Sequence, residues 1–304
     1  MRARQQGVAI VLAMGVVALA ALAATAMMVS QSTWSRQVEL TAGHGQAQLL
    51  IRAGLDWARA VLSDDRRASN VDYLGEPWAL KLPPIPVENG ELVGEIQDQQ
   101  GLFNLNNLAP DGKLSTVQLA RFQRLLAMLG LPSELAGALA DWIDGDGEPQ
   151  PRGGAEDSYY LSLESPYLAA NRPLTDAAEL ALIRGFDDTV RARLRPYVTA
   201  LPALSAVNVN TAPAAVLAAV IDGLDFSAAQ SLVAQRDRAY YRDRDDFLRR
   251  LPRGVEADPA NIGVSSDYFL ARLRVTIGGS QANGQALIAR AGTGWPVIIW
   301  RKYL

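Results

Sequence analysis

The feature that most constrains this chain is an apolar run near its beginning. Residues 8–29 read VAIVLAMGVVALAALAATAMMV, which is 22 residues without a charge or a proline. A helix of this length extends about 33 Å, enough to cross the hydrocarbon core of a bilayer. The seven residues before it carry Arg2 and Arg4 and no acid. The positive-inside rule therefore predicts a cytoplasmic N-terminus, with the rest of the chain on the other side of the membrane.

Two ordinary classes of N-terminal segment share these properties. A cleaved secretory signal has a basic start and an apolar region of about 7–15 residues that ends in a small-x-small site. Ala21, Ala23 and Ala24 could supply such a site. A plain membrane anchor needs only the length. The run is longer than most signals, which favours a retained helix, but the run alone leaves both interpretations open.

The junction before the apolar run favours a third interpretation. Gln6-Gly7-Val8 places a glycine directly between the basic leader and the apolar stretch. This junction resembles the leader of type IV pilins and type II secretion pseudopilins, which the prepilin peptidase cleaves after the glycine. The resemblance implies that Gly7 and Val8 form the cleavage site, that the Val8 amine is methylated and that the helix is kept. Leu12 departs from the pattern, because most pilins have glutamate at this fifth mature position.

Composition narrows the possible chemistry. The chain has 304 residues with 29 basic and 32 acidic side chains, hence a net charge of −3, and it has one histidine and no cysteine. This charge balance does not favour nucleic acid as a partner. The missing cysteines and the single histidine exclude the common zinc and thiol sites. No Gly-x-Ser-x-Gly motif is present, so a hydrolase is the weakest of the functions considered and no enzyme is expected.

Beyond the apolar run, hydrophobic periodicity predicts that the helix continues to residue 64. Leu50, Trp57 and Val61 recur at i, i+7 and i+11, an amphipathic stripe suited to packing on a sheet. Gly43 and Gly45 each weaken a helix by up to about 1 kcal/mol relative to alanine. These two glycines predict a bend or local melting near residue 44.

The remaining elements divide into strands at both ends and helices between them. Alternating apolar residues predict strands at 87–97, 271–277, 285–290 and 297–303. Helical patterns occur at 115–129, 132–143, 175–182, 187–197, 212–221, 227–236 and 244–251. A helical insertion therefore interrupts a small antiparallel sheet.

This order of elements and six short motifs resemble the K-type minor pseudopilin of the type II secretion system over nearly the whole chain. The motifs are Gly7-Val8, Phe103-Asn104-Leu105-Asn106, and residues 141–146 (DWIDGD), 153–157 (GGAED), 171–174 (NRPL) and 207–212 (VNVNTA). The resemblance implies an α+β pseudopilin fold, in which a long N-terminal helix packs on a small antiparallel sheet, with a large inserted all-α domain. The implied divisions are a leader (1–7), a transmembrane and stalk helix (8–64), a pseudopilin body (65–108 and 264–304) and the insert (109–263).

The same resemblance implies a place in the cell. K-type subunits are single-pass inner-membrane proteins with a periplasmic body, they assemble with I- and J-type and other pseudopilins, and they lack the fifth-position glutamate. In pilin fibres that glutamate pairs with the N-terminal amine of the neighbour toward the tip. A subunit with Leu12 there cannot compensate a neighbour above it, which predicts that this chain caps the tip of the pseudopilus. Leu12 and the stripe of Leu50, Trp57 and Val61 are the expected partner contacts.

A loop rich in carboxylates is the strongest chemical feature of the insert. It contains six acidic side chains within 17 residues: Asp141, Asp144, Asp146, Glu148, Glu156 and Asp157. Such crowded like charges favour a bound cation, and oxygen ligands without histidine or cysteine favour calcium. Pro149 and Ala155 stand where an EF-hand needs glycine and glutamate, so this is no EF-hand, and a solvated acidic loop is the alternative. The resemblance implies calcium, because K-type pseudopilins bind it in the insert.

The insert also contains an internal repeat. Gly130-Leu131 recurs 93 residues later as Gly223-Leu224, and each pair lies between two predicted helices. We interpret the two units as helix-hairpin-helix-like. Such hairpins bind DNA phosphate through a Gly-x-Gly turn, but Pro132 and Asp225 replace the second glycine, so a packing role is favoured and no nucleic acid is expected. A membrane-anchored DNA-binding protein of a competence-like system is the alternative function.

Overall fold

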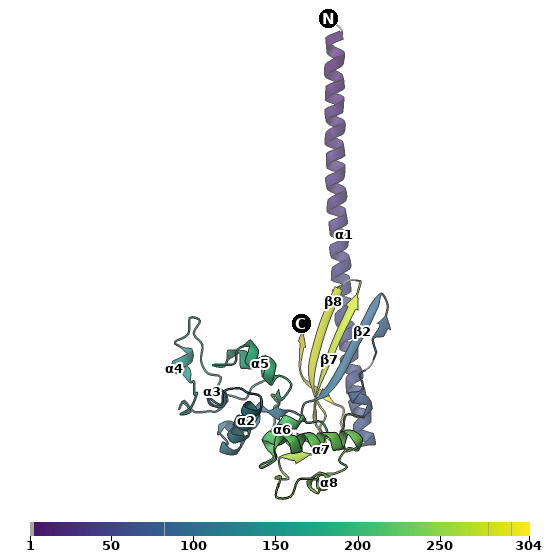
Figure 1. Cartoon of the computed structure of the whole chain (residues 1–304). Coiled ribbons are helices and arrows are strands. Elements are labelled where there is room, and N and C mark those ends of the chain that lie inside the picture. Colours follow the sequence, from purple (N-terminus) through teal and green to yellow (C-terminus); the bar gives the residue numbers. More distant parts are fainter. Residues whose placement is uncertain (1–2, 82, 279, 293) are drawn as a thin grey trace.

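The structure is a computed structural model that describes residues 3–81, 83–278, 280–292 and 294–304. Its longest element is the helix α1 (Ala3–Ala68) of 66 residues, which at 1.5 Å per residue is about 100 Å long. Residues 9–39 are exposed, and this part of the helix projects away from the folded body (Figure 1). Within the described residues, α1 is the one helix long and apolar enough to cross a membrane.

The helix α1 is continuous through Gly43 and Gly45, so the bend predicted near residue 44 is wrong. Gly43 lies against the turn that joins two strands. A β-carbon built there would lie 3.4 Å from the Ser280 hydroxyl oxygen and 3.7 Å from the Ile277 carbonyl oxygen. Ala47, about one turn later, is fully buried. Packing on the sheet therefore offsets the low helix propensity of glycine.

The buried face of α1 differs from the predicted stripe. The helix packs on the sheet through Ala47, Ile51, Leu55, Ala58 and Leu62, which are 0–2 % exposed. Leu50 and Val61 flank this face and are only partly buried, whereas Trp57 is 49 % exposed. Apolar residues recur at helical spacing on both of these faces. Periodicity therefore finds the amphipathic helix, but the position of the sheet selects which face is buried.

The sheet has five antiparallel strands in the order β1-β2-β7-β8-β9. They are β1 (Ile85–Val87), β2 (Gly90–Asp98), β7 (Tyr268–Ile277), β8 (Ser280–Ala289) and β9 (Val297–Tyr303). The predicted strand 87–97 starts at Gly90 instead, because Asn89 adopts φ 58° and closes a hairpin between β1 and β2. This left-handed conformation is one that asparagine tolerates. The last predicted strand, 297–303, has the predicted bounds.

Helices are the main regular elements of the segment between β2 and β7. The 3-10 helices, marked η, are η2 (Leu105–Leu108), η3 (Pro110–Gly112) and η4 (Ala177–Leu182). The α-helices are α2 (Thr116–Met128), α3 (Leu135–Ile143), α4 (Asp157–Tyr160), α5 (Asp188–Leu194), α6 (Ala214–Val220), α7 (Phe226–Arg238) and α8 (Arg244–Leu248). A further 3-10 helix, η1 (Pro77–Ala79), precedes the sheet. Two parallel pairs of two-residue strands also lie there, β3 (Phe103–Asn104) with β4 (Val198–Thr199) and β5 (Val207–Asn208) with β6 (Ile262–Gly263). The predicted all-α insert would contain helices alone. The short strands show that the segment is not wholly α-helical.

The mixed architecture confirms the predicted combination of a long N-terminal helix with an antiparallel sheet. One hydrophobic core lies between α1 and the sheet, and a second, larger core lies within the helical segment. Figure 1 shows the helical segment beside and below the sheet, at the end opposite the projecting part of α1. The domain boundaries predicted at residues 64, 108 and 263 stay predictions.

A buried polar network joins the helical segment to the sheet. Asp98, the last residue of β2, accepts hydrogen bonds from the Asn208 amide at 3.0 Å and from the Ser266 hydroxyl at 2.7 Å, as well as from the Thr211 hydroxyl. The Asn208 amide also donates to the Asp72 carbonyl oxygen at 3.1 Å. Burial raises the pKa of Asp98 to about 6 despite these hydrogen bonds. These hydrogen bonds hold the helical segment in place at the end of β2.

Candidate metal centre and buried carboxylate clusters

The acidic loop begins on a helix that is buried on all sides. Every residue of α3 from Leu135 to Ile143 is buried. Its Trp142 ring packs edge-on against Tyr160, with ring centroids 5.1 Å apart. Gly137 lets the loop lie directly on the helix, because a β-carbon there would come within 2.1 Å of the Arg152 carbonyl oxygen. The loop is thus held on a rigid support.

Three of the six predicted carboxylates converge at the end of α3. Asp144, Asp146 and Glu156 each offer an oxygen, and these oxygens lie within 4.8 Å of one another. Asp144 is 1 % exposed and Glu156 5 %, while Asp146 is exposed. Both carboxylate oxygens of Asp144 and both of Glu156 are buried without a hydrogen-bond donor in the described part of the chain. Burial, followed by the neighbouring acids, raises the pKa of Asp144 and of Glu156 to about 7.

The other three predicted carboxylates lie outside this group, and two of them accept backbone hydrogen bonds. Asp141 braces the loop, because its carboxylate accepts the backbone N–H of Gln150 at 3.1 Å and of Ala155 at 2.7 Å. Gly154 permits this arrangement, since a β-carbon there would lie 2.6 Å from Asp141 Oδ2. Asp157 accepts the backbone N–H of Ala169 at 2.9 Å. Glu148 is exposed and lies outside the converging group.

The converging group fits a hard divalent cation. Four buried carboxylate oxygens without donors are costly unless a cation or protons compensate them. The set contains only oxygen ligands, which suits calcium and does not suit zinc or copper. Gly145 anchors the loop from the other side, because its N–H donates to the Gly112 carbonyl oxygen at 2.9 Å. Asp144, Asp146 and Glu156 are therefore the residues that would hold the ion.

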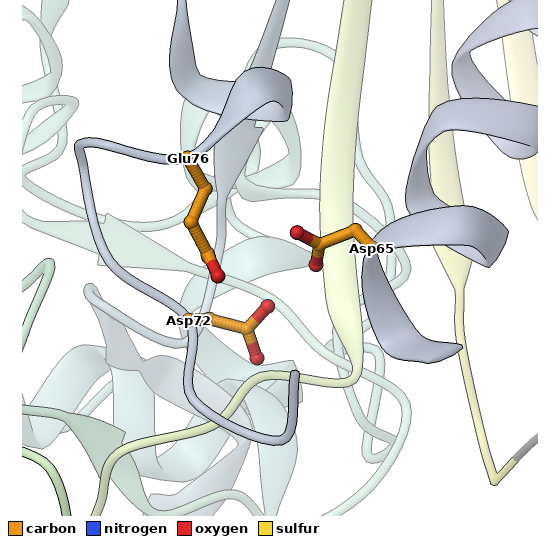
Figure 2. A group of neighbouring side chains, drawn as sticks. All are labelled: Asp65, Asp72 and Glu76. Atoms are coloured by element: carbon orange, nitrogen blue, oxygen red, sulfur yellow. The ribbon is translucent and has the colours of Figure 1, made fainter. Parts of the chain in front are cut away.

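A second carboxylate cluster lies at the lower end of α1 (Figure 2). Asp65 of α1, together with Asp72 and Glu76 of the following loop, brings three carboxyl groups within 4.8 Å of one another. Unlike the first cluster, it contains its own cation. The guanidinium of Arg290, 1 % exposed, pairs with Asp65 at 2.6 Å and with Asp72 at 2.5 Å. Sequence spacing does not reveal this cluster, because Arg290 follows the other members by more than 200 residues.

Glu76 is the carboxylate of this cluster that has no cation of its own. It accepts the backbone N–H of Tyr73 at 3.0 Å and the indole N–H of Trp78 at 2.8 Å. Burial raises its pKa to about 7, and the nearby Asp65 and Asp72 add to the shift. Asp65 and Asp72 together with Arg290 leave one net negative charge, so a further negative charge on Glu76 is disfavoured.

We predict that Glu76→Gln reduces the pH dependence of stability. Because the folded-state pKa of Glu76 is raised above its value in the unfolded chain, the folded protein binds the extra proton, and stability falls as pH rises from about 5 to 8. Glutamine keeps the acceptor but carries no charge. The variant should therefore match the parent at pH 5 and exceed it at pH 8 by on the order of 1–3 kcal/mol. Urea unfolding of full-length protein in detergent at both pH values measures this difference.

The exposed Glu91→Gln provides the control for that comparison, because its carboxylate faces solvent. It should leave the pH profile unchanged. Equal slopes for Glu76→Gln and the parent protein would show that Glu76 does not carry the proton.

Two Asn-x-Asn motifs each clamp a distant loop. Asn106 accepts the N–H of Leu174 at 2.8 Å and donates to its carbonyl oxygen at 2.9 Å. Asn210 makes the same pair of bonds with Tyr241, at 2.8 and 2.9 Å. The repeated motif was visible in the sequence, but its role as an amide clamp was not. The Asn106 clamp holds the loop before η4, and the Asn210 clamp holds the turn after α7.

The chain matches known proteins over most of its length. Family models for type II secretion system protein K match residues 101–203 and 207–265. The type II secretion system protein K of Pseudomonas aeruginosa is 37 % identical over 291 residues, covering 91 % of this chain and 86 % of that protein. The chain belongs to the type II secretion system protein K family. The protein K of Klebsiella pneumoniae is 32 % identical, covering 100 % of this chain and 98 % of that protein.

A solved structure extends this protein K relationship to the fold. A chain in the crystal structure of the GspK–GspI–GspJ complex from the type II secretion system of enterotoxigenic Escherichia coli has a TM-score of 0.79 to this chain at 27 % identity. The match covers 88 % of this chain and 99 % of that chain. The family resemblance inferred from the motifs is thereby confirmed.

The remaining predicted site residues of this protein K chain lie on α1. Gly7 and Val8 fall in its first turns, and their side chains lie outside the described residues. Leu12 is 65 % exposed on the projecting part of the helix. Trp57 is the most exposed member of the predicted stripe, and Leu50 and Val61 lie between it and the sheet core. Their contacts with partners stay predictions.

Proposed function

We propose that this minor pseudopilin caps the tip of the type II secretion pseudopilus, where it assembles with I- and J-type minor pseudopilins to initiate the fibre and support export across the outer membrane. The observation that carries this proposal is the match over most of the chain to a chain of the GspK–GspI–GspJ complex. The family is named for a component of the secretion system rather than for an enzyme. None of the reported relatives points to the DNA-binding alternative.

Leu12 and the helical segment both support the tip position. Leu12 leaves the chain without a carboxylate to compensate the N-terminal amine of a subunit above it, and an unpaired charge in hydrocarbon is costly. The chain can still offer its own Val8 amine to a glutamate of the subunit below. The bulky helical segment adds a steric barrier to stacking of another subunit.

We further propose how the chain is anchored and processed. The basic leader and the apolar run favour a single span of the inner membrane with a periplasmic body. Prepilin peptidase would cut between Gly7 and Val8, leaving α1 as the anchor, and the new amine would be methylated. Trp34 lies just beyond the apolar run and is 68 % exposed. This position suits a tryptophan at the boundary between bilayer and water.

Calcium is the proposed ion of the acidic loop. The four orphaned oxygens of Asp144 and Glu156 support this proposal, together with the exposed carboxylate of Asp146 that completes the group. A bound ion would supply positive charge at the group of Asp144, Asp146 and Glu156 and would tie the two ends of the loop together. Asp141 and Asp157 would hold the backbone of the site in place through their amide hydrogen bonds.

The repeated hairpins are proposed to serve packing. The turns at Gly130 and Gly223 have φ of 63° and 77°, and the leucine after each glycine is buried. Helices α2 and α6 of the two hairpins pack together in one core. The Asp225 carboxylate accepts the N–H of Ala228 at 2.8 Å and so caps α7. A carboxylate at this helix N-terminus competes with phosphate for the same N–H groups.

The position of the chain in the fibre tests the proposed function. Labelled full-length chain, imaged on overproduced pseudopili, should appear at one end, and its intact mass should lack residues 1–7. Leu12→Glu should fold normally, and label moved from the fibre end to the shaft would show that Leu12, rather than the bulk of the helical segment, keeps other subunits off. Label spread along fibres built with the parent chain would refute the cap, and a mature chain starting near Ala26 would refute pilin-type processing.

A further inference from the structure

We propose that the cleft between the sheet and the η4–α5 segment binds an acidic segment of another protein. The cleft, called here the sheet–α5 cleft, is lined by side chains from both parts, among them Leu180, Arg191, Arg195, Leu270, Arg272 and Leu287. Its volume of about 420 Å³ lies within the range of about 300–1,000 Å³ that is common for ligand sites. This inference goes beyond the proposed place in the fibre, because it assigns a binding site and the chemistry of its ligand.

The cleft opens on the face of the sheet that α1 does not cover. Successive side chains of a strand point to opposite faces of its sheet. In β7, Phe269, Ala271 and Leu273 belong to the core beneath α1, so Leu270 and Arg272 point to the other face. Figure 1 shows α5 and α1 on opposite sides of the sheet. A subunit packed along α1 therefore lies across the sheet from this cleft and leaves it free for a different protein.

The strand register arranges the floor of the cleft in two rows. In one row Arg272 of β7 lies opposite Gln285 of β8, and Gln285 lies opposite Lys302 of β9. In the next row on the same face, Leu270 lies opposite Leu287. A polar row with two cations thus runs beside an apolar row. This arrangement suits a segment in which an acidic residue is close to an apolar one.

Ion pairing around the cleft leaves one guanidinium without a carboxylate. The two acids that line the cleft, and one acid beside it, already have cationic partners; the pairs are Asp176 with Lys302, Asp188 with Arg191, and Glu95 with Arg272. Arg195 also lines the cleft, at the C-terminal end of α5, and is exposed. It forms no ion pair within the part of the chain that the structure describes. The cleft therefore has one positive charge in excess.

This excess charge selects an acidic ligand. A carboxylate at Arg195 would form charge-assisted hydrogen bonds, which are stronger than those between neutral groups. A basic segment would instead bring a second cation close to Arg195, where both lining carboxylates are already paired. An apolar neighbour of the carboxylate would cover Leu304, which lines the cleft and is 73 % exposed. An acidic segment with an apolar residue beside the acid is thus the ligand that matches the cleft.

A selection from random peptides tests the proposed chemistry without presuming a sequence. Phage displaying random peptides are selected on immobilised full-length chain in detergent, and the most enriched peptide is synthesised with a fluorescent label. We expect the enriched peptides to be acidic. Because the chain has a net charge of −3, non-specific attraction would favour basic peptides instead. Fluorescence anisotropy should then show a Kd at least about tenfold higher for Arg195→Glu than for the parent chain, because the attracting charge becomes repulsive.

Matched variants locate the peptide in the cleft. Arg193→Glu makes the same charge change on the same helix, at an exposed residue that does not line the cleft, and it should bind the peptide as the parent does. Ala192→Trp places a large ring in the cleft and should prevent binding. Thr189→Trp, on α5 but outside the cleft, should not. If Arg195→Glu lowers the melting temperature, the comparison between the two tryptophan variants decides.

Several results would overturn the assignment. They are a selection that enriches no peptide, or only basic and uncharged ones, and equal Kd values for Arg195→Glu and Arg193→Glu. Self-association of the parent chain that Arg195→Glu abolishes, measured by sedimentation in detergent, would place a second copy in the cleft instead of another protein. None of these results bears on the tip position, which the imaging of labelled fibres tests separately.

Discussion

Calcium should raise the unfolding temperature of the full-length protein in detergent, and a chelator should abolish the increase. An ion that binds the folded chain stabilises it by mass action, by about 2.7 kcal/mol at a hundredfold excess over Kd. The effect should be large here because the oxygens of Asp144 and Glu156 have no other partners among the described residues. Thermal melts in calcium and in chelator measure the shift. Magnesium should stabilise less, since it gives up its water ligands reluctantly.

Matched variants test whether calcium binds at the group of Asp144, Asp146 and Glu156. Asp144→Asn with Glu156→Gln should remove the response to calcium, and should raise stability in chelator at pH 8, because two buried charges are gone. Glu148→Gln should keep the full response, since Glu148 is exposed and outside the converging group. Identical melts of the parent chain in calcium and chelator, with no bound metal by elemental analysis, would leave the solvated-loop interpretation.

Replacing Arg290 should produce the largest loss of stability outside the acidic loop. Its guanidinium is buried, pairs with Asp65 and Asp72, and donates to the Ser266 carbonyl oxygen at 2.9 Å. Arg290→Met leaves these carboxylates buried without a cation, which typically costs about 3–5 kcal/mol. Urea unfolding of full-length protein in detergent at pH 8 measures the loss. The loss should be smaller at pH 5, because carboxylates freed of the cation take up protons more readily.

A second substitution distinguishes lost charge balance from lost packing. Asp72→Asn in the Arg290→Met background removes one uncompensated charge and should restore part of the stability. Arg301→Met, at an exposed position of β9, should change stability by less than about 0.5 kcal/mol. Equal destabilisation by Arg290→Met at both pH values, without rescue, would indicate that packing and not the ion pairs is what Arg290 provides.

Local patterns were sufficient for most elements of the fold. The seven helices predicted in the insert all correspond to helices in the structure, because their signals are local. Ser115, Asp187, Asp225 and Asp243 each cap the following helix through a side-chain hydrogen bond. The four predicted strands were also found, since alternation needs only neighbouring residues. The family motifs then connected these elements to a known fold.

The acidic loop was predicted as a set of six, and the fold separated them by role. Sequence spacing shows that carboxylates are close along the chain but not which way each side chain points. Backbone N–H groups brought near by Gly137 and Gly154 engage Asp141, whereas no such donor reaches Asp144 or Glu156. That difference depends on loop geometry, which residue types alone do not specify.

The sequence by itself determined the long apolar helix, the order of helices and strands, and the family, because each rests on short segments and local periodicity. Only the tertiary structure decided which face of α1 is buried and why Gly43 does not bend it. It also decided that Arg290 lies beside Asp65 and Asp72. These features depend on contacts between residues separated by up to some 240 positions, and the free energy of burying an apolar face or a charge is set by what lies opposite it in the folded chain.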